Sequence, residues 1–264
     1  MLVGAMSVSA AKPKLYATAG SHPCAAVEAA LKLKAIDYER VDLLAMSQLV
    51  VGPLRYGGTT VPGMVLDGER LVGSRAIMRR LDGLRPEPPL LPPPGEERFA
   101  RVLEIERWGD EVLQSVPRRI IDVAFLRCPS AMTSYTAETG VPLPEVLVRP
   151  ALPVFARLMA LKNGAGQETV RADIVALPGE LARIDGWIAE GLLGAERPNA
   201  ADLQLGSTIR LLLSIADLRP LIEGHAAAQL ARYFPPMVGE VPAGVLPGEW
   251  LAAAAGSEAL QPSR

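Results

Sequence analysis

The chain has 264 residues, of which 49% are hydrophobic and 21% are charged. This length allows one large or two ordinary domains with full hydrophobic cores. The formal net charge of −2 argues against a strongly basic nucleic-acid-binding protein, and no apolar run is long enough for a transmembrane helix. We therefore expect neither nucleic acid nor a membrane among the partners.

The N-terminal residues and the few cysteines indicate a cytoplasmic protein. Residues 1–11 lack the basic head and the long apolar run of a secretory signal, so we expect a disordered tail. Two cysteines cannot form a disulfide framework, which favours a reducing compartment. Two histidines are too few for a histidine-built metal site, and we expect no metal.

Residues 12–84 combine strand and helix signals. Pro23 suits the first turn of a helix, and Ser21 just before it is placed to cap that helix or to point into its start. Asp67 and Gly68 supply the positive φ angles of a two-residue hairpin turn. The elements we expect, in chain order, are a strand over 14–18, a helix over 25–34, a strand over 38–43, a hairpin of 61–66 with 69–72, and a helix over 74–81 capped by Ser74.

Residues 85–95 are rich in proline, with six prolines between Arg85 and Pro94. Proline lacks the amide donor and fixes φ, so neither a helix nor a central strand crosses this segment. We expect a stiff linker that separates an α/β domain, residues 12–84, from an all-helical domain, residues 96–264.

The apolar residues after the linker recur at helical spacing. The first such run begins at Phe99 and continues until Pro117 interrupts it. Asn199 and Asp202 resemble a capping box, and the helix after them is apolar over most of its circumference, so we expect it to be buried. The other segments we expect are helices over 151–162 and 169–191, a long loop over 128–144, and an irregular stretch from Phe234 onward that wraps this domain.

Four segments carry a resemblance to a known family. They are Gly20-Ser-His-Pro-Cys24, Thr60-Val-Pro62 leading into the hairpin, Gly73-Ser-Arg-Ala-Ile77, and Asn199-Ala-Ala-Asp202. In this order and spacing the chain resembles the glutathione S-transferase superfamily, as a serine-type or divergent bacterial member, over most of residues 14–215. The resemblance implies a thioredoxin-like N-terminal domain, an all-helical C-terminal domain and a homodimer. It also implies a detoxifying transferase with glutathione as co-substrate and no bound cofactor.

The resemblance implies that Ser21 is the catalytic residue. A thiol attacks an electrophile only as the thiolate, and moving a thiol pKa from about 8.5 to about 6.5 takes roughly 2.7 kcal/mol. A charge-assisted hydrogen bond contributes roughly 1.5–3 kcal/mol and a helix N-terminus roughly 0.3–2 kcal/mol. One hydroxyl at a helix start is therefore sufficient without a metal or a general base. The alternative role of Ser21 is a plain helix cap.

Cys24 competes with Ser21 as the residue that handles sulfur. A cysteine in the first turn of a helix can have a lowered pKa and form a mixed disulfide. In cysteine-type members of the superfamily, however, the cysteine stands at the Ser21 position, whereas the Cys24 position often packs behind the strand. We favour a buried, inert Cys24, with a thiol nucleophile as the alternative.

The residues expected to bind the thiol substrate are Val61, Pro62, Ser74 and Arg75. The Val61-Pro62 pair is similar to the superfamily's cis-proline element, which leaves the Val61 backbone free to pair with an extended peptide. Ser74 would offer its hydroxyl and its N–H to a carboxylate. Gly73 stands where the family usually has an acidic residue, and Ala25 where a basic one is common. A thiol other than glutathione is therefore an open alternative.

The pocket for the electrophile should lie between the domains, against the first helix after the linker. On spacing alone its candidates are His22, Trp108, Glu111, Val112 and Ser115. We expect His22 to be exposed beside the site, and Trp108 is equally consistent with a core position. The neighbouring Arg118 and Arg119 are interpreted as a solvated pair or as a charge match at a helix end.

Three functions are consistent with these residues. The leading hypothesis is an enzyme that joins a small thiol to an electrophilic molecule through Ser21. The second is a binding or interaction module that keeps the fold without catalysis, which Gly73 and Ala25 favour. The third is a thiol-dependent reductase or isomerase that uses Cys24.

Overall fold

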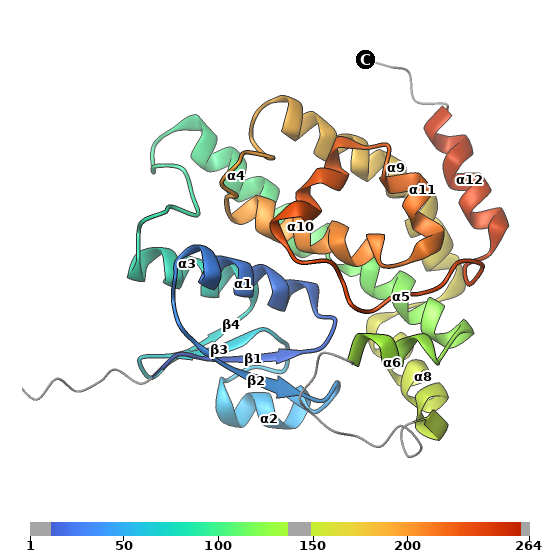
Figure 1. Ribbon diagram of the computed structural model, residues 1–264, viewed down its shortest axis with the longest axis horizontal. Coiled ribbons are helices and arrows are strands. Elements are labelled where there is room, and N and C mark those ends of the chain that lie inside the picture. The colour runs from blue at the N-terminus through green and yellow to red at the C-terminus, as the bar shows by residue number, and fades with distance from the viewer. Residues whose placement is uncertain (1–11, 137–148, 260–264) are drawn as a thin grey trace, which may run out of the picture.

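The computed structural model describes residues 12–136 and 149–259. The predicted tail and residues 137–144 of the predicted loop lie outside the described residues. A four-stranded sheet with helices on both faces is followed by a layer of helices (Figure 1). The predicted fold class, a thioredoxin-like unit followed by an all-helical one, is confirmed.

The sheet has the strand order β2-β1-β3-β4. Strand β1 (Lys14–Thr18) pairs in parallel with β2 (Glu39–Leu43). On its other side β1 pairs antiparallel with β3 (Gly63–Leu66), which forms a hairpin with β4 (Glu69–Val72). All four strands agree with the sequence prediction to within about two residues.

Two turns of the sheet have the backbone conformations that their sequences favour. Asp67 and Gly68 have φ angles of 50° and 82°, which confirms the two-residue hairpin turn. The Val61–Pro62 peptide bond before β3 is cis, as the resemblance implies.

Helices cover both faces of the sheet. Helices α1 (His22–Leu33) and α3 (Ser74–Leu84) lie on the face that meets the helical layer, and α2 (Gln48–Arg55) lies on the opposite face (Figure 1). Because side chains alternate along a strand, β1 serves both faces. Its Leu15 joins the buried cluster of α1 and α3, and its Tyr16 packs on the other side against Tyr56, with ring centroids 5.1 Å apart.

Helix α2 was not expected from the sequence. Gly52 and Pro53 stand in the middle of this helix, and both residues normally argue against one. The glycine is required by packing, since a Cβ at position 52 would collide with the carbonyl oxygen of Gly58 and with the ring of Tyr56. A tertiary contact therefore overrides the local helix propensity.

The second layer consists of helices, and α10 lies at its centre (Figure 1). The long helices are α4 (Glu97–Trp108), α5 (Ser115–Arg127), α8 (Leu152–Asn163), α9 (Gln167–Ala189), α10 (Ala200–Leu213) and α12 (Gly248–Ala259). The short segments are η1 (Gly109–Leu113), α6 (Ala131–Thr136), η2 (Arg149–Ala151), η3 (Ala216–Leu218), α11 (Arg219–Ile222) and η4 (Ala226–Tyr233).

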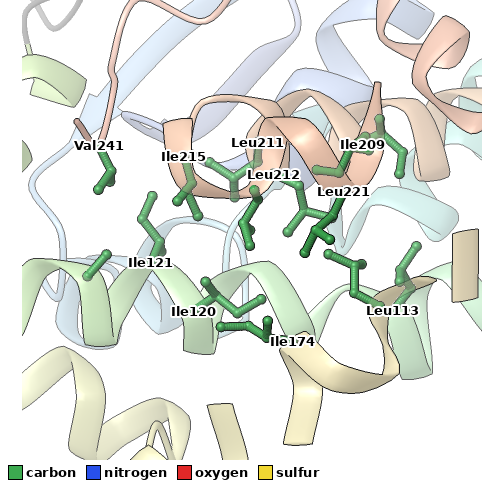
Figure 2. Packing of buried hydrophobic residues seen from close by; sticks show 14 of the residues in the cluster. Leu113, Ile120, Ile121, Ile174, Ile209, Leu211, Leu212, Ile215, Leu221 and Val241 are labelled. Atoms are coloured by element: carbon green, nitrogen blue, oxygen red, sulfur yellow. The ribbon is translucent and has the colours of Figure 1, made fainter. Parts of the chain in front are cut away.

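Helix α10 is buried on nearly all sides, as predicted. Figure 2 shows Ile209 and Leu212 of α10 above the side chains of α5, including Ile120. On its other side, Ala200 and Leu203 of α10 belong to the cluster formed by the sheet, α1 and α3. One helix thus contributes to the cores of both layers.

The expected break at Pro117 is wrong. The chain passes from α4 into the π-helical segment η1, where the N–H of Gln114 donates to the carbonyl of Gly109 at 2.9 Å. Pro117 lies in the first turn of α5, where a helix tolerates its missing N–H. The interruption comes from a wider helical turn upstream of the proline.

Two segments expected to be irregular contain helices. Helix α6 stands in the predicted loop, with Met132 and Tyr135 buried on one side. Helix α12 stands in the predicted C-terminal wrap, where Trp250 and Ala254 join the main core. In both segments the nearby prolines and glycines hid short helical patterns that are stabilised mainly by tertiary packing.

Between Leu84 and Glu97 the described chain forms no helix or strand, as expected for a proline-rich segment. Leu90 in this segment is fully buried, and its carbonyl accepts a hydrogen bond from the N–H of Ala200 at 2.7 Å. The segment is therefore fixed against the start of α10. The division of the chain into two domains at residues 85–95 stays a prediction.

Candidate functional site

A cavity of about 190 Å³ lies between the thioredoxin-like layer and the helices that follow it. The first layer lines it with the turn between β1 and α1, the start of α2 and the residues before β3. The helical layer lines it with α5, α6, α8 and α10. The predicted site residues that meet in this cavity are Ser21, His22 and Val61.

Ser21 stands at the N-cap position of α1 with an extended backbone, φ −73° and ψ 107°. Its carbonyl accepts the first helical hydrogen bond, from the N–H of Ala25 at 3.1 Å, but its side chain makes no capping hydrogen bond. The half-buried hydroxyl is therefore not used to cap the helix. An anion placed against it would lie at the positive end of the helix dipole.

Cys24 is buried one turn into α1, with 1% of its surface exposed. Burial raises the pKa of its thiol to about 11, although hydrogen bonding by Ser21 and by the Thr18 backbone opposes this rise. At neutral pH the thiol is protonated. A protonated and buried thiol is a poor nucleophile, so the geometry favours the inert reading of Cys24 over the reactive one.

The expectation that His22 is exposed is wrong, since only 3% of its surface is accessible. Burial lowers the pKa of the imidazole well below its ordinary value, and the charge of Arg118 lowers it further, so the ring is neutral. Its Nε2 atom has no hydrogen-bond partner among the described residues, nor has Oε1 of the buried Gln48. Two residues of the cavity wall thus carry buried polar atoms that a ligand could satisfy.

One face of α5 supplies site residues that the sequence analysis missed. They are Arg118, Ile121, Asp122 and Phe125. Their spacing of i, i+3, i+4 and i+7 marks a single helix face, which is the signal that could have found them. The interpretation of Arg118 and Arg119 as a solvated pair is wrong, because Arg118 lines the cavity and Arg119 pairs with Asp173 of α9 at 2.7 Å.

Most of the predicted electrophile residues lie outside this cavity. Those outside it are Trp108, Glu111, Val112 and Ser115. The last three line a second hollow, of about 300 Å³, between the start of α5 and α9. Trp108 packs edge-on against Trp187, with ring centroids 5.1 Å apart. The π-helical turn η1 explains the discrepancy for Glu111, Val112 and Ser115, which lie within or after it, because the wider turn changes which face a given spacing reaches.

Asp122 is a buried carboxyl group in the cavity wall, and its Oδ2 accepts a hydrogen bond from Nδ2 of Asn163 at 2.7 Å. Burial raises its pKa from 3.8 to about 6, against the lowering effects of Asn163, Lys162 and Arg118. The folded state therefore binds a proton more tightly than the unfolded state does. The wild-type protein loses this contribution to stability as the pH rises from about 4 to about 6.

Replacing Asp122 by asparagine is expected to change how stability depends on pH. Asparagine does not titrate. The free energy of unfolding of the variant relative to the wild type should therefore increase as the pH rises from about 4 to about 6, by up to about 3 kcal/mol. Urea denaturation at about pH 4.5 and about pH 7.5 measures the difference. An equal difference at the two pH values would contradict the raised pKa.

The comparisons with known proteins agree with this geometry. The family model described as the glutathione S-transferase N-terminal domain matches residues 15–89. The match over these residues agrees with the resemblance to the glutathione S-transferase superfamily stated from the sequence. No curated protein is significantly similar to the chain.

Solved structures extend the likeness in fold to most of the chain. A glutathione S-transferase from Rhodospirillum rubrum F11 superposes with a TM-score of 0.56 at 20% identity, covering 91% of this chain and 99% of that one. A glutathione S-transferase from Sinorhizobium meliloti 1021 superposes with a TM-score of 0.56 at 18% identity, covering 92% of this chain and 99% of that one. The β-etherase LigF from Sphingobium sp. strain SYK-6 superposes with a TM-score of 0.58 at 18% identity, covering 84% of this chain and 94% of that one. The chain therefore has the glutathione S-transferase fold.

Two further features bear on the site of this glutathione S-transferase fold. Across the described ranges, none of the helices combines the length and apolar character that crossing a membrane requires. Within the same ranges, no three His, Cys, Asp or Glu side chains gather in a way that could hold a metal ion.

Gly73, at the position where the superfamily usually has an acid, is the N-cap of α3. Ser74 is therefore the first residue of that helix, and its expected role as cap is wrong. Gly73 has φ 88° and ψ 148°, and its N–H donates to the Pro62 carbonyl at 2.9 Å. This backbone conformation favours glycine, so an acidic side chain here would strain the turn.

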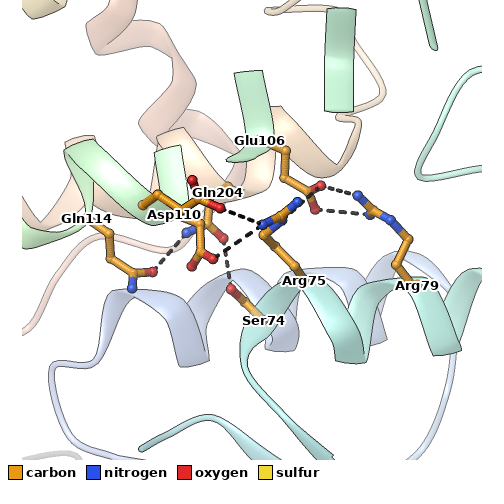
Figure 3. A network of polar contacts seen from close by, with 8 residues as sticks. Ser74, Arg75, Arg79, Glu106, Asp110, Gln114 and Gln204 are labelled. Atoms are coloured by element: carbon orange, nitrogen blue, oxygen red, sulfur yellow. Dashed lines mark hydrogen bonds and ion pairs between the residues drawn. The ribbon is translucent and has the colours of Figure 1, made fainter. Parts of the chain in front are cut away.

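The two residues after Gly73 are engaged within the protein (Figure 3). Ser74 is buried, and its hydroxyl donates to Oε1 of Gln204 at 2.9 Å. The guanidinium of Arg75 lies within ion-pair distance of Glu106 at 3.7 Å and of Asp110 at 3.8 Å. Neither Ser74 nor Arg75 lines the cavity that holds Ser21.

Proposed function

We propose that the chain is a glutathione S-transferase-like enzyme that joins a small thiol, glutathione or a related one, to an electrophilic small molecule. The observation that carries this proposal is the position of Ser21. Its hydroxyl stands at the N-terminus of a 12-residue helix, does not cap that helix, and lies in the wall of the cavity between the two layers. A homodimer, a cytoplasmic location and the absence of a resident cofactor belong to the same proposal.

The proposed reaction has two steps. The bound thiol loses its proton to water, and the Ser21 hydroxyl donates a hydrogen bond to the resulting thiolate at the positive end of α1. The thiolate then forms a bond to the electrophilic carbon, and the leaving group departs with the electron pair of the bond that breaks. The roughly 2.7 kcal/mol needed to lower a thiol pKa by about two units is within reach of one charge-assisted hydrogen bond and a helix N-terminus.

The competing route through Cys24 has less support. A mixed disulfide would need the Cys24 thiolate, and burial raises the pKa of that thiol to about 11. Its sulfur is also almost inaccessible. Ser21 has neither handicap, because its hydroxyl acts as a donor without ionising.

The thiol is proposed to lie along Val61, which lines the cavity and precedes the cis bond to Pro62. The usual contacts to a γ-glutamyl group are weakened here, since Gly73 has no acidic side chain and Ser74 already donates to Gln204. Glutathione therefore remains one of several thiols to be tried. The candidates differ at the amino and carboxyl ends and share the sulfur that Ser21 would hold.

Replacing Ser21 by alanine is expected to lower kcat/KM by at least about tenfold at neutral pH, since one charge-assisted hydrogen bond to the thiolate is lost. The same change should move the pKa of the bound thiol toward the free value of about 8.5. Steady-state assays with an aryl chloride and several cellular thiols measure both effects over a pH series.

Two control variants make this test specific. Cys24→Ala should keep activity, whereas the reductase or isomerase route requires its loss. Ser257→Ala removes a hydroxyl of α12 that donates to Val175 and Ala254, away from the cavity, and should leave the pH profile unchanged. A Ser21→Ala variant as active as the wild type would refute the assigned role.

A non-catalytic binding module is the second candidate. The engagement of Ser74 with Gln204 and of Arg75 with Glu106 favours it, because both residues are tied within the protein. Such a module should bind no thiol in calorimetry and show no Ser21-dependent turnover. Turnover that Ser21→Ala reduces would exclude this candidate.

A further inference from the structure

Arg118 is a cation of the cavity wall without a carboxylate partner. It is half-buried on α5, and among the described residues no carboxylate oxygen lies within 4.0 Å of its guanidinium. Its near polar neighbour is neutral, since its Nη2 lies 2.8 Å from the amide of Gln114. Other arginines near the helical layer are paired, as Arg79 is with Glu106 and Arg119 with Asp173.

An arginine in this position is suited to bind an anion. The guanidinium stays charged at any working pH and carries five N–H donors in a planar fork, of which Gln114 can take one. Burial lowers the pKa of Arg118, although the negative charges of Asp110 and Asp122 oppose this effect, so the guanidinium is only partly compensated. A carboxylate matches the fork with two parallel hydrogen bonds and would complete this compensation.

The rest of the helical wall indicates which kind of molecule would bear the anionic group. Phe125 and Tyr135 pack edge to face with centroids 5.5 Å apart, and Ile121 extends this apolar surface. Lys162 of α8 adds a second positive charge, while Asp122 is the one carboxyl group among the described lining residues. The wall therefore combines an aromatic surface with an excess of positive charge.

We propose that this cavity selects an electrophile that is an aromatic acid, with its ring against Phe125 and Tyr135 and its carboxylate on Arg118. The inference rests on the proposed function and names its substrate class. Ser21 lines the same cavity from the first layer, so the carbon to be attacked faces the sulfur while the carboxylate is held on α5. Arg118 is a specificity-determining residue in this arrangement.

The test compares two matched electrophiles, a chlorodinitrobenzoate with chlorine para to the carboxylate and its primary amide. With glutathione, the wild type is expected to favour the acid over the amide by at least about tenfold in kcat/KM, the range of a charge-assisted hydrogen bond. Arg118→Met should remove this preference, so that the acid and the amide have similar kcat/KM values. Arg119→Met, one residue along α5 and outside this cavity, should keep the preference for the acid.

A binding measurement separates this inference from the proposed function. Calorimetry without thiol compares dinitrobenzoate and dinitrobenzamide, which lack the leaving group. A preference for the acid that Arg118→Met removes supports the anion site even if neither chlorinated compound reacts, in which case only the proposed function fails. Turnover of both compounds without preference, or an Arg118→Met variant that weakens glutathione binding instead, overturns the inference.

Discussion

Replacing Lys34 by methionine is expected to lower the free energy of unfolding by about 3–5 kcal/mol, the cost of breaking a buried charge pair on one side. The Lys34 side chain is fully buried, and its Nζ forms an ion pair with Asp82. The same Nζ donates to the carbonyls of Arg85 and Pro88, both at 2.6 Å, and to that of Pro86 at 3.3 Å. Methionine fills the volume but leaves four acceptors without their donor.

This cluster joins the end of α1 to the end of α3 and to the proline-rich segment. Arg85 reinforces it, since its Nη1 donates to the carbonyls of Lys34 and Ala35 at 2.6 and 2.7 Å. The segment continues to Leu90, whose N–H donates to Asp82 at 2.9 Å. Loss of Lys34 should therefore loosen both the first layer and its connection to α10.

Chemical denaturation of three variants tests this expectation. Lys32→Met removes an exposed lysine two residues away and should change the free energy of unfolding by less than about 0.5 kcal/mol. Asp82→Asn keeps an oxygen for the N–H of Leu90 while removing the charge. Its loss in the free energy of unfolding should therefore lie between those of Lys32→Met and Lys34→Met. A Lys34→Met variant within about 1 kcal/mol of wild type would contradict the role assigned to this lysine.

Several local elements of both layers could be predicted from the sequence because their signals are short-range. The turn at Asp67 and Gly68 depends on two φ angles, and the capping box at Asn199 depends on one residue three positions later. The preference for a buried Cys24 also came from the sequence, through the family position. The turn and the capping box each depend on neighbours within one turn of chain.

The cavity could not be predicted in the same way, because its helical wall joins segments far apart in the sequence. The bond between Asn163 and Asp122 links α8 to α5, and no spacing rule predicts such a pair. The burial of His22 likewise depends on how α1 meets the helical layer. The π-helical turn η1 also places Ser115 on a helix face that regular α-helical spacing does not predict.

Replacing Asp202 by alanine is expected to lower the free energy of unfolding by about 2–6 kcal/mol, because two partly buried N–H groups lose their acceptor at about 1–3 kcal/mol each. Asp202 is fully buried at the start of α10. Its Oδ2 accepts from the N–H of Asn199 at 3.0 Å and its Oδ1 from the N–H of Gly194 at 2.7 Å.

The matched variant Asp202→Asn retains one amide oxygen and should lose less than half as much stability as Asp202→Ala. The effect should be global and not confined to the cap, because α10 contributes to the cores of both layers. Denaturation followed by tryptophan fluorescence and by circular dichroism should therefore give one coincident transition, shifted in both signals. Two separate transitions, or an alanine variant as stable as the wild type, would show that the capping box is dispensable for holding the layers together.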